Sequence, residues 1–202
     1  MPVVEIHRFP ASDAFIADQS IAKRLLDNLK GTKGQIERYY GLQIEDGKTG
    51  FLVLVWESYE HFVDLKNGSS YLTLIEVFKA LHIEGAQSQI HVHFDGDTTP
   101  AFKAPTTEFV FAGAKEGVAS TIEERKKAFY TITTKLRTVK GFHGAVAGEI
   151  RGESDTFGAV LGWDSVDAHV QAVATEELKS AFEAFMEITS PVVAHVKLTR
   201  HD

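Results

Sequence analysis

The chain has 202 residues, of which 44% are hydrophobic and 24% charged, and its formal net charge is −7. This composition is typical of a folded globular protein and excludes a disordered chain. The acidic balance and the lack of a large Lys/Arg cluster argue against nucleic-acid binding, and no apolar run approaches the roughly 20 residues of a membrane-spanning helix.

The first half of the chain alternates between strand-like and helix-like patterns. Apolar residues near helical spacing follow Asp13, and two runs rich in β-forming residues flank the turn at 46–50, which indicates a hairpin. In chain order the expected elements are a strand at Val3–Phe9, a helix from Asp13 to about Gly31, strands at Gln35–Ile44 and Phe51–Trp56, a helix capped by Ser58 and broken near Asn67, and a strand at Gln89–Phe94.

The second half repeats this order of elements. Its first helix is expected to begin at Thr121, which forms a capping-box pattern with Glu124. The other expected elements are a strand at Thr107–Phe111, strands at Phe142–Ile150 and Thr156–Trp163, a helix capped by Ser165 that runs with a break to about Ile188, and a strand at Val193–Leu198.

Shared landmarks in the two halves indicate an internal duplication. Each half opens with a strand that carries a glutamate, and each later has a Lys-Gly pair, a tryptophan followed by an acidic residue and a serine, and a His-Val strand. These landmarks are Glu5, Lys33-Gly34, Trp56 and His91 in the first half, and Glu108, Lys140-Gly141, Trp163 and His195 in the second. Four landmarks in the same order predict a tandem repeat.

The order β-α-β-β-α-β in each half is that of a ferredoxin-like α+β unit. Residues 96–105 carry two prolines and several turn-forming residues, so we expect a linker there, between a first repeat at 1–95 and a second at 106–202. Helices cover only one face of such a sheet, and the other face needs a cover. The two repeats are therefore expected to pair as an intramolecular dimeric α+β barrel. A monomeric pseudo-dimer is expected, and further association into a homodimer stays open.

Two segments resemble a known superfamily. They are Trp163-Asp164-Ser165-Val166-Asp167-Ala168-His169 and the terminal strand His195-Val196-Lys197-Leu198. They resemble the dimeric α+β barrel superfamily, and within it the antibiotic-biosynthesis-monooxygenase-like (ABM domain) and stress-responsive A/B-barrel groups, including tandem versions among fungal proteins. The resemblance implies one ferredoxin-like repeat in each half. The superfamily that the chain resembles includes cofactor-free oxygenases, polyketide cyclases, haem-degrading enzymes and proteins with no known reaction. In the first half, Phe62 stands at the position that matches His169.

Histidines are the candidate catalytic residues. A neutral imidazole near pH 7 can accept a proton from a phenol or an activated carbon acid. In the cofactor-free enzymes that the chain resembles, such a base suffices, because an electron-rich substrate supplies its own reducing power. His91 is the predicted base, and His169 and His195 are further candidates. The alternative is that each imidazole is only hydrogen-bonded to a neighbouring strand or helix.

Aromatic residues with a polar tip would line an apolar cleft between sheet and helices and suit an aromatic or polyketide-like ligand. The predicted substrate-binding residues are Tyr39, Tyr40, Trp56, Tyr71 and Trp163. The alternative is that these rings belong to an ordinary core. Four of the five tyrosines lie in the first half, which is therefore favoured as the active half.

A metal site is the alternative reading of the first half's histidines. Strand alternation puts Glu5 and His7 on one face and likewise His91 and His93, and the first and last strands of a ferredoxin-like sheet are neighbours. Three imidazoles and a carboxylate would suit Zn²⁺ or another divalent ion. The competing interpretation is a polar patch or a solvent-facing strand, and it is preferred. No cofactor is therefore expected, with this cluster and haem on His169 as the alternatives.

The sequence thus leads to three functional hypotheses. The first is a cofactor-independent monooxygenase or cyclase that acts on a small aromatic or polyketide-like molecule, and the second is a non-catalytic stress-responsive or ligand-binding protein. The third is a metalloprotein built on the histidine cluster. The absence of cysteine excludes disulfides and thiol catalysis and, with no signal-peptide pattern at the N-terminus, predicts a cytoplasmic protein.

Overall fold

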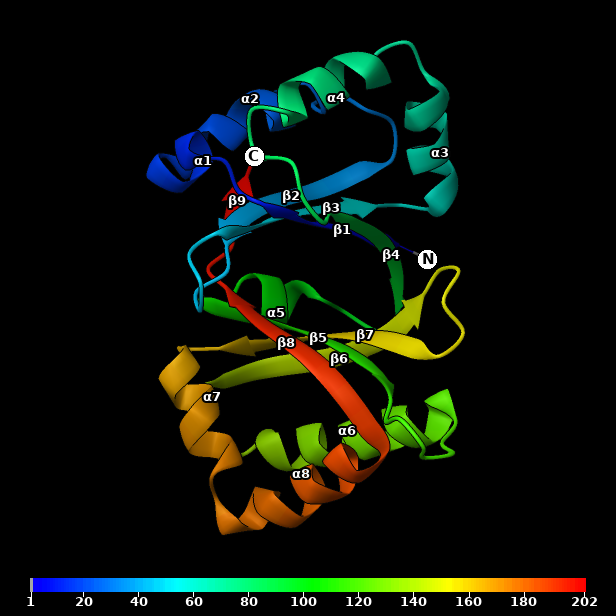
Figure 1. Ribbon diagram of the computed structural model, residues 1–202, viewed down its shortest axis with the longest axis vertical. Coiled ribbons are helices and arrows are strands. Elements are labelled where there is room, and N and C mark those ends of the chain that lie inside the picture. The colour runs from blue at the N-terminus through cyan, green and yellow to red at the C-terminus, as the bar shows by residue number, and fades with distance from the viewer. Residues whose placement is uncertain (1) are drawn as a thin grey trace. The chain divides into compact units, whose positions relative to one another are not determined.

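Apolar strands and amphipathic helices form two units in the computed structural model, which describes residues 2–202 (Figure 1). The first unit contains the residues up to His93 together with Val196–Asp202, and the second contains Phe94–His195. No helix within residues 2–202 is long and apolar enough to cross a membrane.

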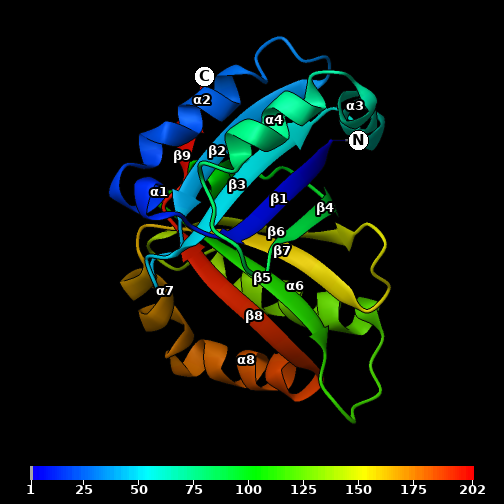
Figure 2. The ribbon, with the colours of Figure 1, turned by 45° about the horizontal axis from the view of Figure 1, so that its top comes forward.

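The first unit has a ferredoxin-like sheet with the strand order β4-β1-β3-β2, to which β9 is added at the edge beside β2. All neighbouring strands in it are antiparallel. Its helices lie over one face of this sheet (Figures 1 and 2). The elements are β1 (Val3–Pro10), α1 (Asp13–Ala17), a 3-10 helix (Gln19–Ile21), α2 (Ala22–Asp27), β2 (Gln35–Leu42), β3 (Thr49–Trp56), α3 (Tyr59–Asn67), α4 (Tyr71–Phe78), β4 (Ser88–Phe94) and β9 (Thr199–His201).

The second unit repeats this arrangement with the strand order β8-β5-β7-β6. Its elements are α5 (Thr99–Phe102), β5 (Thr106–Ala114), α6 (Ile122–Leu136), β6 (Phe142–Ile150), β7 (Thr156–Trp163), α7 (Val166–Val173), α8 (Glu176–Ile188) and β8 (Thr189–Val196). The predicted capping box is present, because Thr121 and Glu124 bind each other's backbone N–H groups. The α+β class with two ferredoxin-like repeats is thereby confirmed.

Local side-chain bonds explain where several elements begin. Ser12 Oγ accepts from Phe15 N–H at 3.1 Å and starts α1. The single long helix expected after Asp13 is instead broken at Asp18, whose backbone is extended and whose carboxylate caps the following 3-10 turn. In the β2–β3 turn, Asp46 accepts from the N–H groups of Lys48 and Thr49. These bonds hold the hairpin that the sequence predicts.

The predicted linker is wrong, because part of 96–105 forms the short helix α5 and packs into the second unit. Phe102 is buried, and Thr107 Oγ1 donates to the carbonyl of Ala101 at 2.8 Å. Pro100 lies at the start of this helix, where a missing N–H costs nothing. Gly162 permits the close packing, since a Cβ there would lie 2.8 Å from the Pro100 carbonyl oxygen.

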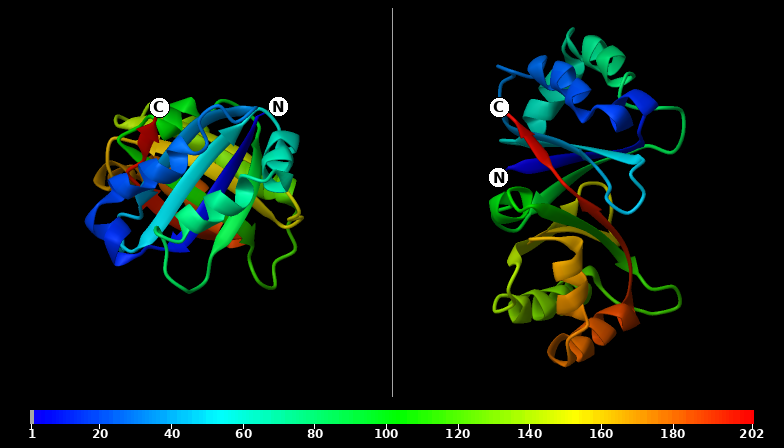
Figure 3. Two further views of the ribbon diagram at one scale, coloured as in Figure 1. Left: turned by 90° about the horizontal axis from the view of Figure 1, so that it is seen from above. Right: turned by 90° about the vertical axis from the view of Figure 1, so that its left-hand side faces the viewer.

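The predicted end of the second repeat is also wrong, because residues 196–202 belong to the first unit. β9 pairs with β2 in antiparallel register, with Tyr39 opposite Arg200. His201 Nε2 lies 2.9 Å from Asp27 Oδ1 at the end of α2, and Figure 3 shows β9, in red, beside that helix. An edge strand needs a partner for its backbone groups, and the C-terminal segment provides one.

Candidate functional site

A buried glutamate bound by a tryptophan lies under the helices of each unit. Trp56 Nε1 donates to Glu5 Oε2 at 2.7 Å, and Trp163 Nε1 donates to Glu108 Oε2 at the same distance. All four side chains are buried. The glutamate and the tryptophan that mark each repeat in the sequence are therefore hydrogen-bonded to each other in both units. Each carboxylate also lines a cavity.

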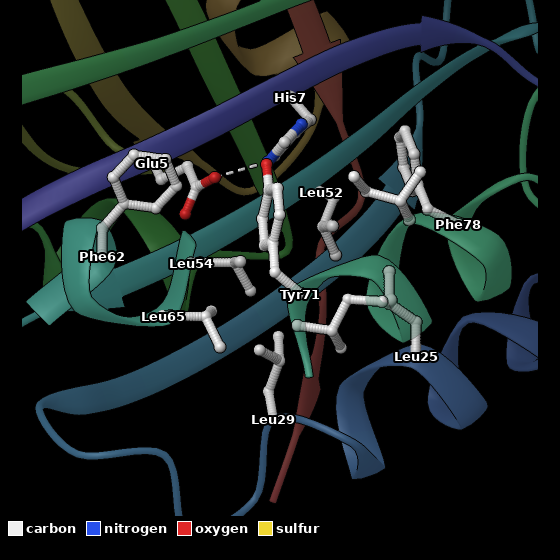
Figure 4. Close-up of a pocket in the computed structure, with 12 residues that line it drawn as sticks. Glu5, His7, Leu25, Leu29, Leu52, Leu54, Phe62, Leu65, Tyr71 and Phe78 are labelled. Atoms are coloured by element: carbon white, nitrogen blue, oxygen red, sulfur yellow. Dashed lines mark hydrogen bonds and ion pairs between the residues drawn. The ribbon is translucent and has the colours of Figure 1, made fainter. Parts of the chain in front are cut away.

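In the first unit this carboxylate has three hydrogen-bond partners. Besides Trp56, His7 Nε2 lies 2.7 Å from Glu5 Oε1, and Gln89 Nε2 donates to the same oxygen at 2.6 Å. The adjoining cavity of about 80 Å³ is mainly apolar. Figure 4 shows the hydroxyl end of Tyr71, from α4, pointing towards Glu5 and His7. The other lining side chains are Leu25, Leu29, Leu52, Leu54, Phe62, Leu65, Leu74, Ile75 and Phe78.

The charge state of Glu5 follows from these partners. Burial by itself raises the pKa of this carboxyl, but the positive potential of His7 and His91 and the bonds from His7 and Gln89 outweigh it. The net result is a pKa below the ordinary value. Burial and the nearby charge of Glu5 raise the pKa of Tyr71, which therefore stays a neutral phenol.

Replacing Glu5 with Gln is expected to make the fold less sensitive to acid. Because the folded-state pKa of Glu5 lies below its unfolded value, its stabilisation is fully present above the unfolded pKa and is lost as the pH falls through the folded pKa. Thermal unfolding followed by circular dichroism between neutral pH and about pH 3 should show the wild type and variant converging in acid. The exposed Glu123→Gln is the matched control. Parallel pH profiles for wild type and Glu5→Gln would contradict this assignment.

The metal cluster considered as an alternative in the first unit is not assembled. Glu5 and His91 are opposite each other in the β1–β4 register, as strand alternation predicts. The His91 ring, however, packs against Phe62 and Tyr59, with ring centroids 4.3 and 5.0 Å away, and does not line the cavity. Within residues 2–202, the group of His and carboxylate side chains with three ligand atoms close together lies in the second unit instead.

The second unit places three chemistry-bearing side chains together. Glu108 comes from β5, His169 from α7 and His195 from β8. His169 Nε2 lies 3.8 Å from Glu108 Oε1, and His169 Nδ1 lies 2.9 Å from His195 Nε2. Ser165 Oγ accepts from Ala168 N–H and starts α7, which places His169 in the turn that faces the sheet. Its ring also packs against Trp163, with centroids 5.0 Å apart.

The cavity beside these residues is larger than the one in the first unit. Its volume is about 250 Å³, close to the lower end of the roughly 300–1,000 Å³ that is typical of small-molecule sites. Glu108 and His169 are its ionisable lining residues. The other lining residues are Val110, Phe129, Ile132, Leu136, Leu161, Trp163, Val173, Phe182, Phe185, Met186, Pro191 and Val193. Phe182 and Val193 are 37% and 39% exposed, so the rim of the cavity is apolar as well.

The predicted aromatic residues fall in different places. Tyr71 lines the cavity of the first unit, and Trp163 lines that of the second. Trp56 lies behind Glu5, and Tyr40 belongs to the core under the helices. Tyr39, next to Tyr40 in β2, points to the opposite face and donates to Glu37 Oε2 at 2.9 Å. Tyr39 therefore does not line the helix-side cavity.

No protein-family model matches the chain, and no curated protein is similar to it in sequence. Solved structures share its fold over nearly the whole length. A proposed monooxygenase from Lactobacillus acidophilus is 14% identical, with a TM-score of 0.65 over 98% of this chain and 93% of that chain. A proposed monooxygenase from Fusobacterium nucleatum is 12% identical, with a TM-score of 0.68 over 100% and 94%.

An anthrone oxidase-like protein is 15% identical, with a TM-score of 0.67 over 98% of this chain and 91% of that chain. At these identities the likeness concerns the fold. It agrees with the strand order of each unit and with the tandem repeat. The chain therefore shares the fold of these solved structures, with one ferredoxin-like repeat in each half.

Proposed function

We propose that the chain is a cofactor-independent oxygenase that oxidises an electron-rich aromatic or polyketide-like molecule with O₂ in the cavity of the second unit. One observation carries the proposal: an apolar cavity of about 250 Å³ has a carboxylate and an imidazole at one end, 3.8 Å apart. The apolar wall would hold the rings of the substrate, and the imidazole would take its proton.

His169 is the base in this proposal. His169 Nδ1 lies 2.9 Å from His195 Nε2, and in the tautomer that donates Nδ1–H to His195, Nε2 carries the lone pair on the side of Glu108. The carboxylate of Glu108 would stabilise the imidazolium that forms when Nε2 takes a proton. Trp163 holds this carboxylate in place through its second oxygen. His195 acts as a positioning residue, because its contact selects the tautomer of His169.

The expected chemistry can be written for anthrone, a carbon acid with three fused rings. His169 removes a proton from the carbon opposite the carbonyl, and the carbanion passes one electron to O₂. The two radicals combine into a hydroperoxide, which loses water to form the quinone, with the imidazolium returning its proton. The balance is one anthrone and one O₂ to one anthraquinone and one water, so the substrate supplies all the electrons.

The first unit has a different role in this proposal. Its cavity measures about 80 Å³, and Glu5 Oε1 is already bonded to His7 and Gln89. Phe62 takes the place that His169 has in the second unit. These features favour a non-catalytic first unit, against the expectation that the first half is the active one.

Replacing His169 with Phe, the residue that the first repeat carries at the matching position, is expected to slow turnover by at least about 10²-fold, because the general base is lost. O₂ uptake and the appearance of anthraquinone from anthrone, corrected for autoxidation, measure this rate. The exposed His143→Ala, in the same unit, is the matched control. Wild-type turnover in His169→Phe would disprove the role of His169, and a wild-type protein inactive on anthrones and related polyketide phenols would disprove the oxygenase itself.

A further inference from the structure

Glu108, His169 and His195 also have the donor set of a metal site. Each offers one ligand atom, and these atoms lie within 4.8 Å of one another. Two imidazoles and one carboxylate suit divalent transition metals, with positions left open for solvent or another ligand. The metal cluster that the sequence left as an alternative concerned other residues, in the first unit, and only the fold brings these three together.

The spacing of the two imidazoles fits an ion between them. His169 Nδ1 and His195 Nε2 are 2.9 Å apart. Zn–N bonds of about 2.0–2.1 Å in tetrahedral geometry put two ligand nitrogens about 3.3 Å apart, so a small rotation of either ring would admit the ion. A hydrogen bond between the two ring nitrogens needs one proton, and a divalent ion would take the place of that proton.

The carboxylate of Glu108 is also positioned to bind an ion. Trp163 Nε1 binds Oε2 of Glu108 at 2.7 Å, while Oε1 lies on the side of His169. An outer partner that fixes one oxygen and leaves the other towards the metal is the usual second-shell arrangement in metalloproteins. Glu108 and His195 are 4% and 5% exposed, and His169 lines the cavity. The cavity would therefore supply the open coordination position.

The first unit provides an internal comparison. Glu5, Trp56 and His91 are the counterparts of Glu108, Trp163 and His195, but Phe62 replaces His169. In the first unit, Glu5 Oε1 is bonded to His7 and Gln89. The first unit thus lacks one of the three ligands, so a single site per chain is expected.

We infer that Glu108, His169 and His195 form a binding site for one divalent transition-metal ion, such as Zn²⁺ or Co²⁺, in the second unit. This site goes beyond the proposed function and does not depend on it. A bound ion would occupy a nitrogen of His169 and disturb the tautomer that the proposed base needs. Metal binding and proton abstraction at this site would therefore exclude each other.

The test uses the full, untagged chain after a chelator has removed any bound metal. Co²⁺ is titrated into this protein while the visible absorption is monitored. The titration is then repeated with Zn²⁺ in a calorimeter. We expect one ion per chain for the wild type and for His143→Ala. His169→Phe and Glu108→Gln should weaken binding by more than the 10–100-fold that loss of an outer partner typically costs. Circular dichroism of each variant checks that it is folded, and Glu108→Gln keeps an acceptor for Trp163.

Two results would overturn the inference: no bound ion in the wild type, or binding that His169→Phe and Glu108→Gln both leave unchanged. The titration uses neither substrate nor O₂, so its failure would leave the oxygenase proposal standing. Conversely, a protein that binds one ion through these residues and oxidises no anthrone would retain the metal site and lose the proposed activity.

Discussion

Trp56→Ala is expected to lower the free energy of unfolding by about 3–5 kcal/mol, as deletion of a large buried ring does when the surroundings relax only in part. The Trp56 side chain is fully buried and packs against Phe62, with ring centroids 6.3 Å apart. Its indole N–H also donates to Glu5 at 2.7 Å. The substitution therefore leaves both a cavity and a buried carboxylate with one partner fewer. Urea unfolding followed by far-ultraviolet circular dichroism measures the loss.

Two further variants separate the contributions of Trp56. Trp56→Phe keeps most of the ring volume and removes the donor, so we expect a smaller loss of about 1–3 kcal/mol. Leu72→Ala, at a position that is 72% exposed on α4, should change stability by no more than about 0.5 kcal/mol. If Trp56→Ala behaved like Leu72→Ala, the Glu–Trp pair would not be the structural centre of the first unit.

Arg125→Ala should destabilise the second unit by about 2–4 kcal/mol, because hydrogen bonds from a charged group and a buried aliphatic stem are lost together. Arg125 is fully buried near the start of α6. One guanidinium nitrogen donates to the carbonyl and hydroxyl oxygens of Ser120, at 2.6 and 3.0 Å. The other donates to the carbonyl and carboxylate of Asp155, both at 2.8 Å. The side chain thus connects α6 to the turn before β7. Thermal and urea unfolding measure the free energy of unfolding that is lost in the variant.

Arg125→Lys tests whether the planar guanidinium group of Arg125, and not its charge alone, stabilises the fold. Lysine keeps the charge but cannot bind both partners in this geometry, and an intermediate loss is expected. The exposed Arg137→Ala, at the other end of the same helix, should be close to neutral. Equal stabilities for the Arg125 and Arg137 alanine variants would show that the ties to Ser120 and Asp155 contribute nothing.

Much of the architecture follows from local patterns in the sequence. The order of strands and helices in each half and the hairpin at Asp46 depend on alternation, capping and turn chemistry, which act over a few residues. Alternation also places Glu5 opposite His91 on one face, as the β1–β4 register confirms. The repeat is visible because both copies keep the Glu–Trp pair, and that pair is needed to bury a carboxylate in each unit.

The candidate site was less predictable, because its members come from separate elements. Nothing local in the sequence indicates that His169 of α7 lies between Glu108 of β5 and His195 of β8. His91 has the same strand position as His195, but the rings of Phe62 and Tyr59 pack against it. A histidine pattern on a strand cannot show which helix residue will cover it.

The sequence by itself determined the α+β class, the duplication and the face on which the ionisable strand residues lie, since these depend on periodicity and short-range bonds. Only the tertiary structure decided the rest. A register shift between Gln35 and Glu37 affects which side of β2 each tyrosine faces. The helix α5 and the pairing of β9 with β2 depend on contacts between residues far apart in the chain. Long-range contacts leave no periodic signal, and they assemble Glu108, His169 and His195.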